Sequence, residues 1–133
     1  MKLNVIIIDD SLVQLALSSR LIKKNEQLNL IGTYSDPFLG LQAAKYQDVD
    51  VVLLDVEMPE IDGFSLQKLL EDSVDVILNS TRISFELQAY VNGAIDFLHK
   101  PLTTHKINRA VARIREMKSI LAVQDTLVTT MAS

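Results

Sequence analysis

The stretch that decides the fold is "VVLLDVEMPEIDG", which runs from Val51 to Gly63. Four apolar residues lead directly to Asp55, and three more acids follow before the glycine. A short apolar, β-branched run predicts a strand buried on both faces, as in parallel sheets. The acids have a simple explanation, since a strand that leaves the core enters a polar loop. Alternatively, Asp55 lies where a buried sheet meets solvent because it is a chemical site.

Similar apolar runs recur along the chain and alternate with segments of helical periodicity. Signals for helix starts support this alternation, at Ser11-Leu-Val-Gln14, at Asp36-Pro37 and at Thr103. We expect strands at residues 3–8, 28–34, 50–55, 74–80 and 94–98, each followed by a helix. The alternation implies right-handed βαβ crossovers, and therefore a doubly wound α/β fold with helices on both faces of a five-stranded parallel sheet.

Helical spacing assigns an inward face to the first and last helices. The first helix is expected to direct inward Leu12, Leu15, Ala16, Ser19 and Ile22. The last helix is expected to direct inward Ile107, Ala110, Val111, Ile114, Met117 and Leu121. Residues 123–133 are less periodic, so we expect a frayed end or the start of a linker there. The chain is thereby divided into a domain at 1–122 and a C-terminal tail at 123–133.

Length and composition are those of a soluble globular protein with one domain. The chain has 133 residues, of which 48% are hydrophobic and 23% charged. No apolar run approaches the roughly 20 residues that cross a bilayer, so no membrane contact is expected. The absence of cysteine excludes disulfides and thiolate metal sites and agrees with a cytoplasmic location. A net charge of -4 argues against direct nucleic-acid contact.

Polar residues stand at the carboxyl ends of four of the expected strands. Parallel strands share a direction, so these ends meet at one edge of the sheet whatever the strand order, and ligands bind at this edge in open α/β sheets. The residues at this edge are Asp9, Asp10, Asp55, Ser80, Thr81, His99 and Lys100.

This set of side chains suits phosphoryl chemistry. Three carboxylates in one cleft repel one another unless a cation neutralises them, and oxygen ligands suit Mg²⁺. A carboxylate such as Asp55 is also a nucleophile toward phosphorus, with Lys100 and Ser80 placed to hold the phosphoryl oxygens. Singly, each residue has a plainer role, as a helix cap, a loop acid, a solvated lysine or a strand-end hydroxyl. Their convergence at one edge favours a site.

Four motifs, in order, resemble the receiver domain of bacterial two-component response regulators. They are "IIIDDS" (6–11), "LLDVEMPEIDG" (53–63), "ILNS" (77–80) and "AIDFLHKP" (94–101), and the resemblance covers about residues 2–121. The segments "VEMPEIDG" and "VNGAIDFLHKP" are similar to the corresponding segments in receivers of the LytTR class. The resemblance implies a flavodoxin-like sheet with strand order 2-1-3-4-5.

The resemblance also implies a role for each residue of the site. Asp55 is the phosphoacceptor. Asp10 and Asp55 bind Mg²⁺ directly, Asp9 assists mostly through water, and the backbone carbonyl of Glu57 completes the protein ligands. The phosphoryl oxygens are held by Ser80 and Lys100.

Two further features follow from the same resemblance. Phe97 occupies the switch position, where the ring turns inward when the hydroxyl residue, here Ser80, moves. The Lys100-Pro101 peptide bond is expected to be cis, which on base rates is a minority outcome.

Three residues set this sequence apart within the family pattern. Thr81 stands where the family usually has a small residue, and its bulk narrows access to the phosphate. Glu57 and Arg82 each lie two residues beyond a site residue, and we hypothesise that their ion pair restricts attacking water and lengthens the phosphorylated lifetime. The alternative is a solvent-exposed ion pair of little consequence.

The leading interpretation is a signalling switch without separate substrate turnover. A sensor histidine kinase passes a phosphoryl group to Asp55, and the altered surface acts on an output domain or protein partner. A homodimer through the face formed by residues 84–92, 94–98 and the last helix is a further expectation. One alternative is an Mg²⁺-dependent phosphohydrolase, although Glu57 stands where such enzymes often have a second aspartate. Another is a receiver-like interaction module that is never phosphorylated.

Overall fold

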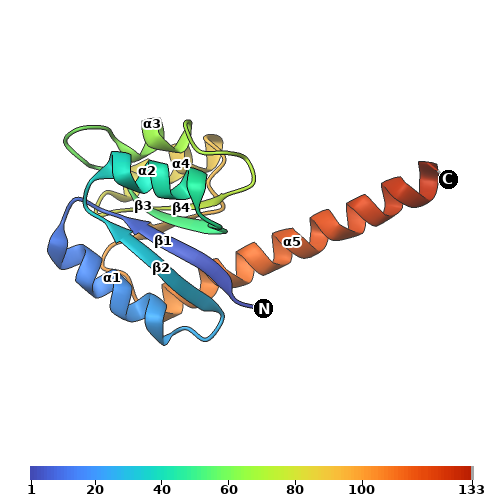
Figure 1. The fold of residues 1–133 in the computed structure, drawn as a ribbon, viewed down its shortest axis with the longest axis horizontal. Helices are drawn as coiled ribbons and strands as arrows, with labels where there is room; N and C mark the ends of the chain where they lie inside the picture. Colours follow the sequence, from blue (N-terminus) through green and yellow to red (C-terminus); the bar gives the residue numbers. More distant parts are fainter. Residues whose placement is uncertain (133) are drawn as a thin grey trace.

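Five strands form one parallel sheet in the order β2-β1-β3-β4-β5 (Figure 1). The computed structural model describes residues 1–132. The elements are β1 (Leu3–Ile8), α1 (Leu12–Lys24), β2 (Leu28–Tyr34), α2 (Pro37–Tyr46), β3 (Val51–Asp55), α3 (Gly63–Gln67), β4 (Asp75–Ser80), the 3₁₀ helix η1 (Ile83–Phe85), α4 (Glu86–Val91), β5 (Asp96–His99) and α5 (Thr104–Ala132). The flavodoxin-like fold and its strand order are therefore confirmed.

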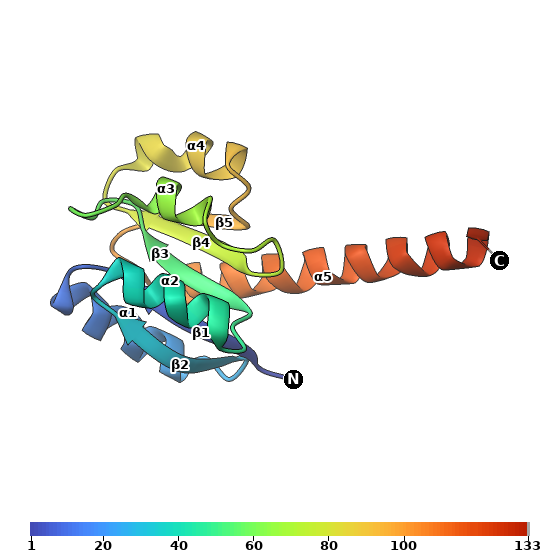
Figure 2. The same ribbon diagram turned by 45° about the horizontal axis from the view of Figure 1, so that its top comes forward.

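Helices cover both faces of the sheet and enclose two apolar cores (Figure 2). One core joins β1, β3, β4 and β5 to α2, α3 and α4, and includes Val52, Leu54, Leu78 and Phe97. The other joins the sheet to α1 and α5 through the alternate strand residues. All five residues of β3 are buried, which explains its unbroken apolar run. Each fully buried aliphatic side chain contributes about 1.5–3 kcal/mol relative to exposure.

The predicted helix-start signals are confirmed by hydrogen bonds from backbone N–H groups. The Ser11 hydroxyl accepts from the amide of Gln14 at 3.3 Å. The Asp36 carboxylate accepts from the amide of Phe38 at 2.9 Å, and the Thr103 hydroxyl accepts from that of Lys106 at 3.2 Å. Each of these oxygens satisfies an N–H group that has no partner within the helix.

The inward face of α1 differs from the prediction. Leu15, Ser18 and Ile22 are buried, whereas Leu12 is 72% exposed and Ala16 is exposed as well. Leu15, Ser18 and Ile22 lie within an arc of roughly 60° on the helix, whereas Leu12 and Ala16 lie roughly 90° or more from its centre, so the buried face runs through Ser18 instead of the phase that the apolar residues alone indicate. An apolar surface is left beside the carboxyl edge of the sheet.

The end of the chain also differs from the prediction. Residues 123–132 continue α5 as a regular helix that projects away from the sheet (Figure 1), so the end of the chain does not fray, whereas the start of a linker there stays a prediction. Ile107, Ala110, Val111 and Ile114 are buried as predicted, but Met117 and Leu121 are 42% and 50% exposed. A 29-residue helix is roughly 44 Å long, about twice the span of a six-residue strand, so its second half has no sheet to cover.

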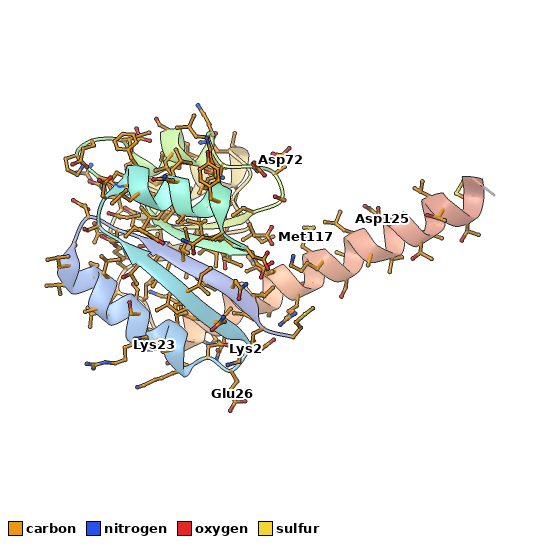
Figure 3. All side chains as sticks on the ribbon, in the orientation of Figure 1. Lys2, Lys23, Glu26, Asp72, Met117 and Asp125 are labelled. Carbon is orange, nitrogen blue, oxygen red and sulfur yellow. The ribbon has the colours of Figure 1, made fainter. Side chains whose placement is uncertain are left out.

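Within residues 1–132, no helix combines the length and the apolar character needed to cross a bilayer. Side chains between Met117 and Asp125 instead extend outward from α5, beyond the two cores (Figure 3).

Candidate functional site

Three carboxylates meet at the carboxyl ends of β1 and β3. Asp9 and Asp10 follow β1, and Asp55 is the last residue of the adjacent parallel β3. One oxygen from each of the three lies within 4.8 Å of the others. Asp9 and Asp55 are buried and Asp10 is exposed. Carboxylate oxygens that converge around an open position fit Mg²⁺, which keeps several water ligands.

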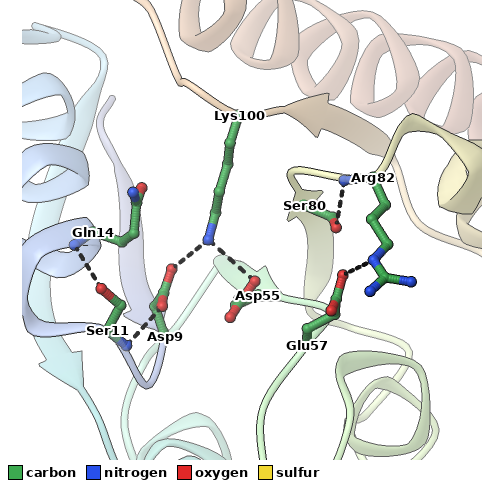
Figure 4. A network of polar contacts seen from close by, with 8 residues as sticks. All are labelled: Asp9, Ser11, Gln14, Asp55, Glu57, Ser80, Arg82 and Lys100. Atoms are coloured by element: carbon green, nitrogen blue, oxygen red, sulfur yellow. Dashed lines mark hydrogen bonds and ion pairs between the residues drawn. The ribbon is translucent and has the colours of Figure 1, made fainter.

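Lys100 lies between the two buried carboxylates. Its ammonium group donates to Asp9 Oδ2 at 3.0 Å and to Asp55 Oδ1 at 3.2 Å (Figure 4). Since β4 separates β5 from β3, the side chain must cross the end of β4 to reach these partners. The Lys100-Pro101 bond is cis, as expected. The predicted convergence of Asp9, Asp55 and Lys100 is thus present in the structure.

The charges at this edge are strongly coupled. Burial, together with the nearby Asp9 carboxylate, raises the pKa of Asp55 from 3.8 to about 7, against the opposing effect of Lys100. Burial disfavours the charge on Lys100, but the Asp55 and Asp9 carboxylates outweigh it and raise the pKa of the ammonium. A divalent cation beside Asp10 would favour the ionised form of Asp55, which is the nucleophilic form.

Ser80 and Phe97 belong to the face of the sheet that carries α4, with Ser80 at the carboxyl end of β4 beside the site (Figure 4). Both are buried, and Phe97 is only 1% exposed within the core that includes Ala89 of α4. In the β4–β5 register Phe97 pairs with Leu78, so Ser80 is two residues farther along the same face. The Ser80 hydroxyl accepts from the amide of Arg82 at 3.0 Å. The Ser80 hydroxyl and the Phe97 ring therefore lie one after the other between the acidic site and α4.

The predicted ion pair between Glu57 and Arg82 is formed. Arg82 Nε lies 3.0 Å from Glu57 Oε1, beside Ser80 and Asp55 (Figure 4). The Glu57 side chain is 45% exposed and the Arg82 side chain is 66% exposed. Thr81 is also exposed, and its carbonyl oxygen lies 2.9 Å from Nε2 of His99. The pair contributes little stability at this exposure, so any larger effect must come from its position.

Asn79 is a site neighbour that the sequence reasoning missed. It pairs with Asp55 in the β3–β4 register, and alternation places both side chains on the side of the sheet that faces α1 and α5. The side chain is buried and its Oδ1 has no hydrogen-bond partner within residues 1–132. A polar residue inside the apolar run "VILNS" was the available signal.

Gly63 keeps the loop after β3 close to the acidic residues. Its amide donates to the carbonyl oxygen of Val56 at 2.7 Å, and an added Cβ would overlap the backbone of Asp55 and Val56. Backbone atoms cannot swing aside as a flexible side chain can.

We therefore expect Gly63→Ala to lower the free energy of unfolding by about 1–3 kcal/mol, as measured by urea denaturation. Gly32→Ala is the control, because the three atoms nearest to its added Cβ belong to the movable ring of Tyr34. An equal loss in both variants would show that the close approach at Gly63 has no special cost.

Comparisons with known proteins agree with this geometry. Residues 5–112 match the response regulator receiver domain family. The chain is 30% identical over 114 residues to an uncharacterized response regulatory protein of Vibrio cholerae, with 84% of this chain and 48% of that protein covered. It is 36% identical over 107 residues to a protein-glutamate methylesterase/protein-glutamine glutaminase of Methylobacillus flagellatus, with 76% and 30% covered. The chain thus spans about half or less of the length of these relatives.

Solved structures resemble the chain over most of its length. A chain of the CheX–CheY–BeF3–Mg complex from Borrelia burgdorferi superposes with a TM-score of 0.75 at 26% identity, covering 84% of this chain and 88% of that one. The receiver domain of the response regulator NarL from Mycobacterium tuberculosis gives 0.74 at 28% identity, covering 86% and 97%. Because the matched residues include the acidic cluster and Lys100, this protein belongs to the response regulator receiver domain family.

Proposed function

We propose that this protein is a phosphorylation-dependent switch in which Asp55 accepts a phosphoryl group. The observation that carries the proposal is the Lys100 ammonium, which contacts two buried carboxylates at a rim that also holds Asp10. An Asp55 oxygen attacks phosphorus while the bond to the donor breaks, and Lys100 and Ser80 hold the phosphoryl oxygens. Asp9, Asp10, Asp55 and the Glu57 carbonyl would hold Mg²⁺, which neutralises charge on the transferred group.

A sensor histidine kinase is the proposed donor. The exposed apolar residues of α1, Leu12, Val13 and Leu17, lie next to the acidic rim, since Ser11 caps α1 and donates its amide to Asp9. Exposed apolar patches of this kind mark protein contact sites. We infer that a helical face of the kinase docks on α1 and brings its phosphohistidine to Asp55. The protein would then act in the cytoplasm, where such a kinase presents its phosphorylated domain.

We propose that the face formed by α4, β5 and α5 transmits the signal to a downstream partner. Asp96 of β5 accepts from the Tyr90 hydroxyl of α4 and from Arg113 of α5, both at 2.9 Å. The next residue, Phe97, is the proposed switch. If Ser80 moves toward a phosphoryl group, Phe97 would move with it. The positions of α4 and α5 would then change, because both helices are hydrogen-bonded to β5 through Asp96. An output domain, a protein partner or a second copy of the chain would bind that face.

We propose no substrate turnover for this chain. The methylesterase named among its relatives is matched over 30% of its own length, so its activity belongs to a protein more than three times as long as the match. A phosphohydrolase would need a general acid beyond Asp55, and Glu57 instead pairs with Arg82.

The test is to incubate the protein with Mg²⁺ and either acetyl phosphate or beryllofluoride. Stable modification of one site, or saturable beryllofluoride binding, supports the switch. Multiple turnover of a phosphomonoester would instead establish a phosphohydrolase. No response to either reagent would leave a receiver-like module that works without phosphorylation, and would overturn the proposal.

The Glu57–Arg82 pair is expected to slow dephosphorylation by obstructing attacking water. Glu57→Ala and Arg82→Ala should each raise the dephosphorylation rate about two- to fivefold, the equivalent of about 0.5–1 kcal/mol in the barrier. The measurement is the decay of the phosphorylated form after donor removal. Glu60→Ala, an exposed acid in the same loop, is the control. Unchanged rates in both variants would end this part of the proposal.

A further inference from the structure

The second half of α5 has an exposed apolar stripe that belongs to neither of the two cores formed by residues 1–132. Every residue from 116 to 131 is exposed. The apolar members of the stripe are Met117, Ile120, Leu121, Leu127, Val128 and Met131, with Gln124 at its centre. We call this set the distal stripe.

The spacing of the distal stripe is that of a coiled coil. Its positions advance by three and four residues, from Met117 through Gln124 to Met131, so they share one side of the helix. The opposite side has small or polar residues at Ser119, Ala122 and Thr126. A stripe of this period fits a second helix along its whole length better than it fits a globular surface.

A helix of this sequence needs a partner to be stable. The exposed part is about 16 residues long, close to the length at which isolated helices are marginal in water. It is also rich in threonine and valine, which have low helix propensity. Burial of the distal stripe against another helix would supply the missing stabilisation.

The distal stripe is continuous with the α4–β5–α5 face. Met117 and Ile120 line a cleft together with Tyr90, Ala94 and Ile95, which belong to α4 and to the approach to β5. Two copies that lie parallel along α5 bring both faces to the same side, whereas an antiparallel pair separates them. The continuity therefore favours a parallel pair.

Charge and polarity in this segment also favour a second copy as the partner. Residues 117–132 have one lysine, Lys118, and one acid, Asp125, so two copies do not repel each other through net charge. In a parallel, in-register pair, Gln124 meets Gln124, and their amides can bond to each other. We infer that α5 pairs with α5 of a second copy as a parallel coiled coil through the distal stripe.

Disulfide cross-linking tests both the pairing and its direction, because the chain has no cysteine of its own. Met117→Cys and Met131→Cys should each form a disulfide-linked dimer on mild oxidation. Thr126→Cys, on the opposite side of the helix, should not. If cross-links form only in a mixture of the first two variants, the pair is antiparallel and the inference is wrong in its direction. If none form, the pairing itself is overturned.

A second measurement tests the energetics without oxidation. Leu121→Asp should weaken dimerisation at least about tenfold in sedimentation equilibrium, whereas Thr126→Asp should leave it unchanged. Equal behaviour of the two variants, or a monomer at every concentration of the unaltered protein, would overturn the inference. Both assays omit a phosphoryl donor, so their failure leaves the proposed phosphorylation of Asp55 intact.

Discussion

Replacement of Asp55 by asparagine is expected to abolish phosphorylation by acetyl phosphate in the presence of Mg²⁺. The transfer requires a carboxylate oxygen that attacks phosphorus while acetate leaves, and an amide oxygen is a far weaker nucleophile. The substitution also removes one of three charges that converge within 4.8 Å, so Mg²⁺ affinity should fall as well. Intact-protein mass spectrometry measures the added phosphoryl group directly, and we expect no modified species in the variant.

The matched control for this experiment is Asp72→Asn. Asp72 is exposed and lies in the turn before β4, at the edge of the sheet opposite the acidic rim, so its replacement changes the net charge equally without touching the site. The control should be phosphorylated as fully as the unaltered protein. Modification that persists in the Asp55 variant, on Asp10 or elsewhere, would show that another residue is the acceptor.

The acidic rim was predictable from the sequence because the prediction needed only the strands. Because β1 and β3 are adjacent and parallel, their carboxyl ends lie at the same edge of the sheet. Asp9 and Asp55, which stand at these ends, are therefore close together. The confirmed cis bond before Pro101 had no such basis, because only the family resemblance indicated it.

Other features depended on packing that a single sequence does not specify. Leu12 has the periodicity of a core residue, but the buried face of α1 runs through Ser18, which apolar periodicity does not select. Met117 and Leu121 continue the apolar period of α5 after the sheet ends, so period alone placed them inside. Likewise, whether the side-chain oxygen of Asn79 finds a hydrogen-bond partner depends on the residues beside it on the adjacent strands.

The stability of the metal-free protein is expected to fall as pH rises from about 4 to about 7. Asp55 faces Asp9, Asp10 and Lys100, and its pKa rises from 3.8 in the unfolded chain to about 7 in the fold. Within that window the folded protein keeps a proton that the unfolded chain releases, so unfolding is favoured as pH rises. The slope due to Asp55 is at most about 1.4 kcal/mol per pH unit, and it vanishes above about pH 7.

Comparison with Asp55→Asn in EDTA isolates this contribution. The variant has no proton to release at position 55, and its amide oxygen still accepts from Lys100, so its stability should lack that slope. The two proteins should be similar near pH 4, and the variant should be more stable by up to about 4 kcal/mol at pH 8, as measured by urea denaturation. Parallel stability curves across pH 4–8 would contradict the raised pKa. If the stability difference grows with pH and added Mg²⁺ reverses it, the bound ion compensates for the Asp55 charge, which the metal-free fold accommodates poorly. Such a cost in stability is expected of a site that serves phosphoryl chemistry.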